Sequence, residues 1–542
     1  MGRAKKGRRR EAQAVRPGSS ASASASTSRE TADAGASVPW SLGPRLRIAL
    51  AAIAALALCA TLRALHPAPW SYDEYYHLGL ARVMQGGLRV TSFRWTPFSV
   101  AFHHFADGSP LFHLLLMPFA SRSLETAGVL GALLGQLFVV ATFAGALLAL
   151  RVPRAPWLLL ALPELGAIVL QRLEMCRPQA WLIGFALLTL ALLALRRWRT
   201  LAVSTALFGL AHTAGWIAIG MALAWTLAGL FARDAGEPAD APLVPWQPIA
   251  ATAGGWLLGQ LVHPELPANF RTIWLSNFVI PYQSTAAGDA LLRSQLGTEL
   301  QPPNAEVVQT LWPAYVVAAL LVGTLLRRPQ ARTRSVLATA LVGLGFLVVG
   351  SLAARRFLEL GAPVSLLALG LAWRADAGAH GTRRRPALAV TAAIALLLAA
   401  LTSVKPLLDE GYGVVSAPLG MAQWLGAHGK PGERVFTAQW ADSAPLFYAA
   451  PQLQSLVLLD PTAFWLQDPA LFARYAAVAE GREPDPMATI RARFGARWVT
   501  VWKAQRYQLL ANQLYHAGAP IVFDDPSYMV FDLAAAPSAS GG

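Results

Sequence analysis

Apolar runs separated by short polar connections occupy most of the chain and determine its predicted architecture. A helix needs about 20 predominantly apolar residues to cross the hydrocarbon core of a bilayer. The runs predict about eleven membrane-spanning helices, several of them shorter than that length. They lie near residues 46–66, 126–150, 156–171, 179–195, 200–213, 215–232, 248–263, 309–326, 333–353, 361–373 and 387–403.

The pattern changes after Ser403, where Pro and charged residues return and short β-type runs alternate with amphipathic stretches. This alternation is typical of a small α/β domain. We expect strands at Arg434–Ala438, Ser455–Leu459, Trp498–Lys503, Ile521–Phe523 and Tyr528–Leu533, and helices at Pro469–Glu480, Pro486–Phe494 and Gln505–Gly518. The predicted fold is therefore mainly α, with a polytopic membrane helix bundle over residues 45–403, an α/β domain over 404–535 and a flexible tail at 536–542.

Residues 1–44 have no apolar periodicity that would build a core. They begin with the basic run Arg3–Arg10 and continue through the Ala/Ser repeat Ser19–Ser28. Chains of this composition bury too little apolar surface to fold alone. We therefore expect a disordered basic tail.

The composition agrees with a membrane protein, because 55% of the 542 residues are hydrophobic and 14% are charged, whereas soluble domains carry about 25% charge. The net charge of +15 does not indicate a nucleic-acid partner, because basic residues gather in the tail and in alternate connections. Those connections contain Arg151/Arg154, Arg196/Arg197/Arg199, Arg327/Arg328/Arg332/Arg334 and Arg374/Arg383/Arg384/Arg385. The positive-inside rule then places the tail in the cytoplasm, and it places the large loops 67–125 and 264–308 and the C-terminal domain outside.

Two adjacent carboxylates, Asp73 and Glu74, stand directly after the first apolar run, on the predicted outer side. The apolar residues that follow predict an amphipathic helix at the membrane surface, whose N-terminal dipole favours negative charge. At helical spacing Asp73 and His77 share one face. The alternative is that the two acids only cap this helix and the neighbouring Tyr and Trp form an interfacial belt.

The stretch Asp73–His77, followed by Ala81-Arg82, resembles the first-loop acidic motif of the GT-C glycosyltransferases, especially the bacterial protein-mannosyltransferase-like and aminoarabinose-transferase-like branches. Gly209–Gly215 is similar to a small-residue segment midway through these proteins, and Ala354–Glu359 to their late Arg-Phe-x-Glu element. Leu459–Pro461 and Phe494–Ala496 resemble parts of their periplasmic domains. The middle segment departs from the family, because His212 stands where Lys is common.

The resemblance implies transfer of a sugar from a polyprenyl-phosphate donor to a glycolipid, polysaccharide or protein acceptor at the periplasmic face of a bacterial inner membrane. Such a reaction needs a base for the acceptor, and a carboxylate at the lipid–water boundary suits that role. Asp73 is the first candidate and Glu74 the second. The lipid phosphate needs cations, and the guanidinium fork of Arg fits phosphate oxygens. The candidate phosphate ligands are Arg355 and Arg356, then Arg172 and Arg177, with His77, His103, His104, Asp107, Glu359 and His212 as supporting residues.

The outer arginines also have an ordinary interpretation, because Arg172 with Glu174 and Arg356 with Glu359 can be local ion pairs. The first outer loop raises a metal hypothesis through His103, His104, Asp107 and His113, but it matches no known ligand motif. We therefore expect no cofactor, with a divalent cation as the alternative. Cys59 and Cys176 have no metal-ligand spacing and are expected to be buried packing residues.

Four aromatic residues, Phe270, Trp274, Phe278 and Tyr282, recur every fourth position in the loop 264–308. This spacing predicts a helix on the membrane with one aromatic face, either at a substrate entrance or as an interfacial belt.

Two other classes of protein remain as alternatives. A transporter or flippase is expected to have paired halves and ionisable residues in mid-span, whereas here they gather at the outer span ends. A non-catalytic scaffold would have no common focus for its outer charges.

Overall fold

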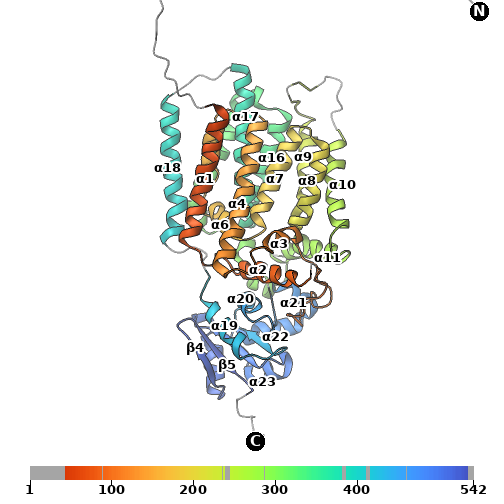
Figure 1. The fold of residues 1–542 in the computed structure, drawn as a ribbon, viewed down its shortest axis with the longest axis vertical. Coiled ribbons are helices and arrows are strands. Elements are labelled where there is room, and N and C mark those ends of the chain that lie inside the picture. The colour runs from red at the N-terminus through yellow and green to blue at the C-terminus, as the bar shows by residue number, and fades with distance from the viewer. Residues whose placement is uncertain are drawn as a thin grey trace, which may run out of the picture. The chain divides into compact units, whose positions relative to one another are not determined.

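A computed structural model describes residues 43–534 except 88, 235, 238–244, 286, 381–385, 410–414 and 459. The predicted tails at 1–44 and 536–542 lie outside the described residues, apart from Gly43 and Pro44. The described residues from Pro44 onward belong to one structural unit. It consists of a helix bundle followed by a smaller domain that contains a sheet (Figure 1).

Each predicted span corresponds to helix in the bundle. The bundle helices are α1 (Pro44–Leu65), α4 (Leu124–Ala149), α5 (Ala155–Ala161), α6 (Ala167–Glu174), α7 (Gln179–Ala194), α8 (Trp198–Ala211), α9 (Ile217–Ala228), α10 (Gln247–Leu261), α15 (Trp312–Arg327), α16 (Arg334–Leu352), α17 (Leu358–His380) and α18 (Pro386–Asp409). Among the described residues, α1, α4, α16 and the helical stretch Arg355–Ala377 are long and apolar enough to cross a membrane. A fifth span results if α6 and α7, bent by 109° at their break, are counted together.

The predicted count of eleven spans is therefore not confirmed. Several bundle helices are short, since α8, α9, α10 and α15 have 14, 12, 15 and 16 residues. At 1.5 Å per residue such helices are about 18–24 Å long, less than the roughly 30 Å of a typical hydrocarbon core.

The predicted span 156–171 is wrong in one respect, because it is two helices, α5 and α6, separated by a turn at 162–166. Gly166 in this turn has φ +135°, a backbone conformation that residues with a side chain rarely adopt. A Cβ at Gly166 would also lie 2.8 Å from the carbonyl oxygen of Thr310. The glycine thus allows both the turn and the close approach of the connection before α15.

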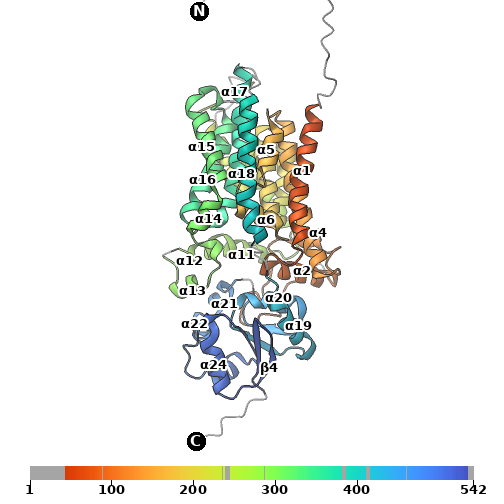
Figure 2. The ribbon, with the colours of Figure 1, turned by 90° about the vertical axis from the view of Figure 1, so that its left-hand side faces the viewer.

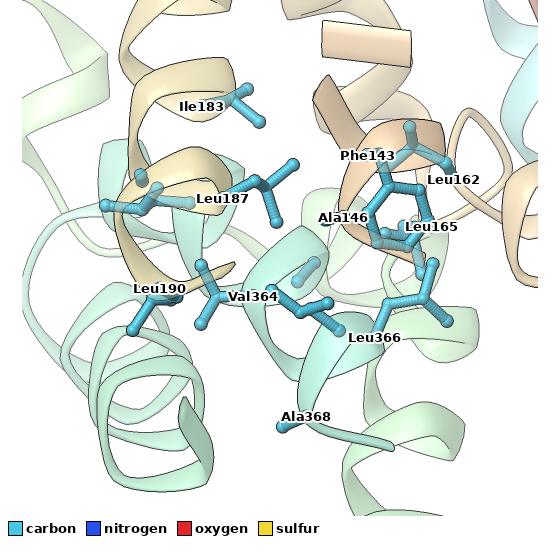
Figure 3. Close-up of a cluster of buried hydrophobic side chains, with 14 of the residues drawn as sticks. Phe143, Ala146, Leu162, Leu165, Ile183, Leu187, Leu190, Val364, Leu366 and Ala368 are labelled. Atoms are coloured by element: carbon cyan, nitrogen blue, oxygen red, sulfur yellow. The ribbon is translucent and has the colours of Figure 1, made fainter. Parts of the chain in front are cut away.

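The core of the bundle lies around α17, whose residues from Leu358 to Ala372 are all buried. Figure 3 shows the buried side chains of α17 packed with those of α4, α7 and the α5–α6 turn, namely Val364, Leu366, Ala368, Phe143, Ala146, Ile183, Leu187, Leu190, Leu162 and Leu165. In a membrane such contacts stabilise the bundle through close packing, which small residues favour. Gly343 of α16 is an example, since a Cβ there would lie 2.7 Å from the backbone nitrogen of Ser365.

Short helices cover the end of the bundle that faces the C-terminal domain (Figure 1). They are α2 (Tyr72–Gln85), α3 (Pro110–Leu116), α11 (Ala268–Trp274), η2 (Leu275–Val279), α12 (Ile280–Gln283), α13 (Ala290–Gln295), η3 (Thr298–Leu300), α14 (Ala305–Thr310) and η5 (Arg355–Phe357). The run α11–η2–α12 is continuous and exposes Phe270, Trp274, Phe278 and Tyr282. The predicted aromatic face is therefore present.

The predicted helix after Asp73 is α2, but it is not an exposed surface helix. Residues 74–81 are buried, because α20 (Ser443–Ala449) of the C-terminal domain packs on α2 (Figures 1 and 2). The hydroxyl of Tyr75 donates a hydrogen bond of 2.8 Å to the carbonyl of Val415. The apolar face of α2 is thus covered by protein, not by lipid.

The C-terminal domain contains a mixed five-stranded sheet of order β2-β1-β3-β5-β4. Its strands are β1 (Arg434–Thr437), β2 (Gln454–Ser455), β3 (Trp498–Trp502), β4 (Ile521–Asp524) and β5 (Tyr528–Asp532), and its helices include α19 (Pro418–His428), α20, α21 (Thr462–Gln467), α22 (Pro469–Ala479), α23 (Pro486–Thr489) and α24 (Gln508–His516). β1 pairs in parallel with β2 and β3, whereas β5 is antiparallel to β3 and β4. The predicted strand Ser455–Leu459 is too long, because the chain leaves the sheet after Ser455, whose N–H donates to the carbonyl of Trp95 at 2.7 Å.

A buried carboxyl group lies where α2 meets this domain. Asp442 has no exposed surface, and its Oδ1 accepts a hydrogen bond of 2.8 Å from the hydroxyl of Tyr528. Burial raises the pKa of Asp442 to about 8, although hydrogen bonds from Tyr528 and Tyr72 oppose the rise. Tyr72 begins α2, so the packing of the two parts involves an acid that is protonated at neutral pH.

We predict that Asp442→Asn makes folding stability less dependent on pH. The folded pKa lies above the usual value of about 3.9, so the contribution of Asp442 is complete below about pH 4 and is lost as the pH rises through 8. Thermal unfolding of the detergent-solubilised proteins between pH 4 and 8 should give a Tm difference, variant minus wild type, that grows with pH. The exposed Asp485→Asn is the control, and a difference independent of pH would contradict the prediction.

Candidate active site

Asp73 lies in the first turn of α2, where the helix dipole favours its charge. Its carboxylate forms an ion pair with Arg177, which follows α6. The Asp73 side chain is 28% exposed, whereas that of Arg177 is 9% exposed. The carboxylate is therefore accessible from outside the protein, whereas the arginine that pairs with it is buried.

Beyond Arg177, acidic and basic side chains alternate, and each contacts the next. Nη1 of Arg177 lies 3.6 Å from Oε2 of Glu299, and Nη2 of Arg172 lies 2.8 Å from the same oxygen. Nε of Arg172 lies 2.7 Å from Oε1 of Glu359. We call Asp73, Arg177, Glu299, Arg172 and Glu359 the charge chain; α2, the α6–α7 connection, η3, α6 and α17 contribute one residue each.

Glu299 remains ionised in this surrounding. Burial alone would raise the pKa of Glu299, but Arg177, Arg172 and Arg356 together bring it well below its usual value. Its side chain is 25% exposed, so the carboxylate lies at the boundary between the protein and its surroundings. The two buried arginines are thus balanced by an anion that a stronger ligand can replace.

Arg355 and Arg356 form η5, immediately before α17. The backbone N–H of Arg355 donates to the carbonyl of Gln301 at 3.0 Å, and its side chain lines a cavity of about 260 Å³ with Gln171 and Arg172. Arg356 makes no ion pair with any residue that the structure describes, although its charge acts on Glu299. The structure therefore brings all four predicted arginines to the region of the charge chain.

The apolar residues of this cavity come from α6, α14 and α18. They are Ala167, Ile168, Val307 and Pro406. The cavity thus combines apolar walls with donors from Arg172 and Arg355.

Glu74 has a different position from Asp73. Its Oε2 lies 2.9 Å from Nη2 of Arg63 in α1, and neither side chain has any exposed surface. Its Oε1 accepts hydrogen bonds of 3.2 Å from the backbone N–H groups of Trp70 and Cys176. Burial raises the pKa of Glu74, and Arg63 opposes that rise. The prediction of Glu74 as an alternative base is therefore not supported, because the carboxylate is enclosed and fastens α1 to α2 and to the α6–α7 connection.

The predicted histidines divide into two groups. His103 and His104 are exposed, whereas His77, His212 and Asp107 are buried. Among the described residues no group of three or more His, Cys, Asp or Glu side chains is placed to hold a metal ion. The structure thus does not gather the four side chains of the metal alternative.

A second hollow lies beside the first outer loop. It has a volume of about 160 Å³ and is lined by residues of the first outer loop, of α11 to α12 and of the C-terminal domain, among them Tyr76, His104, Arg271 and Asp460. Burial raises the pKa of Asp460 to about 6, and Arg356 partly opposes that rise. Asp460, which lines this hollow, is therefore within electrostatic range of Arg356.

Sequence reasoning did not identify Glu299 or Arg63 as site residues. Glu299 lies in a loop that was interpreted through its aromatic residues, and Arg63 lies near the end of the first predicted span. The available signal for Arg63 was a lone cation in an apolar helix, which usually has a partner.

No protein-family model matches the chain, and no curated protein sequence matches it. Among solved structures, the chain is similar to the archaeal oligosaccharyltransferase AglB from Archaeoglobus fulgidus, in a complex with an inhibitory peptide and a dolichol-phosphate. The TM-score is 0.53 at 12% sequence identity, and the match covers 89% of this chain and 74% of that chain. At this identity the likeness shows the fold alone.

We predict that Glu74→Gln destabilises the protein by about 3–5 kcal/mol, because it leaves the buried Arg63 without its counter-charge. The double variant Arg63→Met/Glu74→Gln should lose less than the sum of the two single changes. Chemical unfolding in detergent measures both. The exposed Asp485→Asn is the control, and a Glu74→Gln protein as stable as wild type would contradict the structural role.

Proposed function

We propose that the chain is a membrane glycosyltransferase that moves a sugar from a polyprenyl-phosphate donor to an acceptor at the periplasmic face of a bacterial inner membrane. The observation that carries the proposal is the convergence of a partly exposed carboxylate, Asp73, with Arg177, Arg172 and Arg356 at one end of a GT-C-like bundle. The similar archaeal structure holds a dolichol-phosphate, which supports a lipid-phosphate donor.

The arginines suit the departing phosphate. When the bond between the sugar and the phosphate breaks, negative charge grows on the phosphate oxygens, and fixed cations in a water-poor site stabilise it strongly. Arg356 makes no direct ion pair among the described residues, although its charge acts on Glu299, and Arg172 and Arg177 both pair with Glu299. A phosphate can therefore take over part of their coordination. In this proposal arginines, not a divalent cation, neutralise the phosphate.

The cavity lined by Arg172 and Arg355 is our candidate for the lipid end of the donor. Its donors suit a phosphate, and its apolar walls from α6, α14 and α18 suit the first isoprene unit. A lipid with a polar head and an apolar chain fits such a combination of surfaces.

Asp73 is proposed as the general base for the acceptor. The ion pair with Arg177 fixes the orientation of the carboxylate. Since Arg177 also faces Glu299, arrival of the phosphate at Arg177 changes the surroundings of Asp73 at the same time. Binding of the donor would thus prepare the base.

We predict that Asp73→Asn lowers the transfer rate by a factor of about 10²–10⁴, the usual contribution of a general base. The measurement is transfer from a panel of radiolabelled polyprenyl-phosphate sugars to membrane-extract acceptors by purified protein. Asp485→Asn, an exposed change of the same kind, should retain full activity. An active wild type with an equally active Asp73→Asn variant would show that the base is a different residue. Donor transfer across vesicle membranes without product formation would favour a transporter.

We predict that Arg356→Gln raises the KM for the donor about tenfold, because the phosphate loses a charge-assisted contact from a cation that makes no direct ion pair among the described residues. The exposed Arg482→Gln is the matched control. Initial rates over a range of donor concentrations separate KM from kcat. An unchanged KM for the donor would place the phosphate elsewhere.

A further inference from the structure

Three buried side chains form a hydrogen-bonded line that the reaction above does not yet use. Nδ1 of His77 in α2 lies 2.7 Å from Nε2 of His113 in α3. Nδ1 of His113 lies 2.6 Å from Oδ2 of Asp107, whose Oδ1 accepts a hydrogen bond of 2.9 Å from the backbone N–H of Ser109. We call these three residues the histidine line.

The hydrogen-bonding capacities of the groups determine which nitrogens carry hydrogen. An ionised carboxylate only accepts, so Nδ1 of His113 must donate to Asp107. When both rings are neutral, each has one donor and one acceptor, so Nε2 of His113 accepts from Nδ1 of His77. The remaining nitrogen, Nε2 of His77, therefore presents a lone pair.

This lone pair lies on the same helix face as the proposed base. His77 follows Asp73 by four residues, which makes the two side chains neighbours on α2. Nε2 of His77 has no hydrogen-bond partner among the described residues. The charge chain and the histidine line thus meet at α2.

The surroundings of His77 keep its ring neutral. Burial lowers the pKa of His77 well below its usual value, and His113, Arg177 and His212 lower it further. The other titratable groups near it are Asp73 and Tyr76 of α2 and, beyond His113, Asp107. His212 cannot accept a proton through Nδ1, because this atom accepts the N–H of Ala214 at 3.0 Å.

We propose that His77, His113 and Asp107 form a proton relay that receives the proton which Asp73 removes from an acceptor hydroxyl. The inference rests on the proposed function and assigns the acceptor to the hydroxyl-bearing class. The acceptor oxygen forms a bond to the anomeric carbon, the bond from that carbon to the phosphate oxygen breaks, and the electron pair leaves with the polyprenyl phosphate. The hydroxyl proton passes to Asp73 and then to Nε2 of His77.

The histidine line can then move the added positive charge from His77 towards Asp107. The Nδ1 proton of His77 moves to Nε2 of His113, and the Nδ1 proton of His113 lies against the carboxylate of Asp107. The positive charge is thus placed beside an anion and away from Arg177. Asp73 returns to its ionised form, and the proton leaves by the same route once the product has gone.

The test compares His77→Gln, His77→Ala and Asp107→Asn with His516→Gln, a change at an exposed histidine of the C-terminal domain, under the assay described above. We expect a loss of about 10²–10⁴ in kcat for the first three at an unchanged donor KM. Added imidazole should restore part of the rate of His77→Ala and none of that of Asp73→Asn.

The outcomes separate the two proposals. No transfer by the wild type with any donor contradicts the proposed function. An active wild type with a silent Asp73→Asn and a fully active His77→Gln contradicts the relay alone. Loss of activity in His77→Gln and His77→Ala together with a lowered Tm, and without imidazole rescue, would show that the histidine line only stabilises the fold and would likewise overturn the relay.

Discussion

Alternation of charge at the outer end of the bundle is the constraint on which the rest of the structure depends. A buried arginine without a counter-charge is strongly destabilising, and Arg177 and Arg172 lie between three carboxylates, Asp73, Glu299 and Glu359. These residues come from segments far apart in the chain. The bundle, the outer loops and α2 must therefore adopt one arrangement for all the charges to be paired.

A second ion pair holds α2, and with it Asp73, in place. Arg63 and Glu74 are fully enclosed and join the end of α1 to α2 and to the backbone of Cys176. Because Asp73 precedes Glu74, the buried acid determines where the accessible acid points. The two adjacent carboxylates thus differ, since Glu74 is enclosed and joins the helix to its neighbours, whereas Asp73 is partly exposed.

The apolar pattern predicted the helices of the bundle and most strands of the C-terminal domain, because burial imposes a period that the sequence displays directly. It did not predict the break at Gly166, which depends on a contact with Thr310, or the cover over α2, which depends on a segment more than three hundred residues away. Chemical plausibility selected Asp73 and the four arginines. It ranked Asp73 before Glu74 but did not predict that Glu74 is enclosed, because burial depends on the fold, and it missed Glu299, whose position beside Arg172 arises only from folding.

The position of Glu299 couples the outer loop to the occupancy of the site. Its carboxylate is the part of the charge chain that belongs to the loop 264–308, which also carries the exposed aromatic run α11–η2–α12. An anion that takes Arg172 and Arg177 releases this attachment of the loop. By thermodynamic linkage, anything that pulls the loop away must strengthen anion binding by the same factor. Contact of the aromatic run with the bilayer surface would then act as an effector of donor affinity, and the membrane itself would take part in controlling the site.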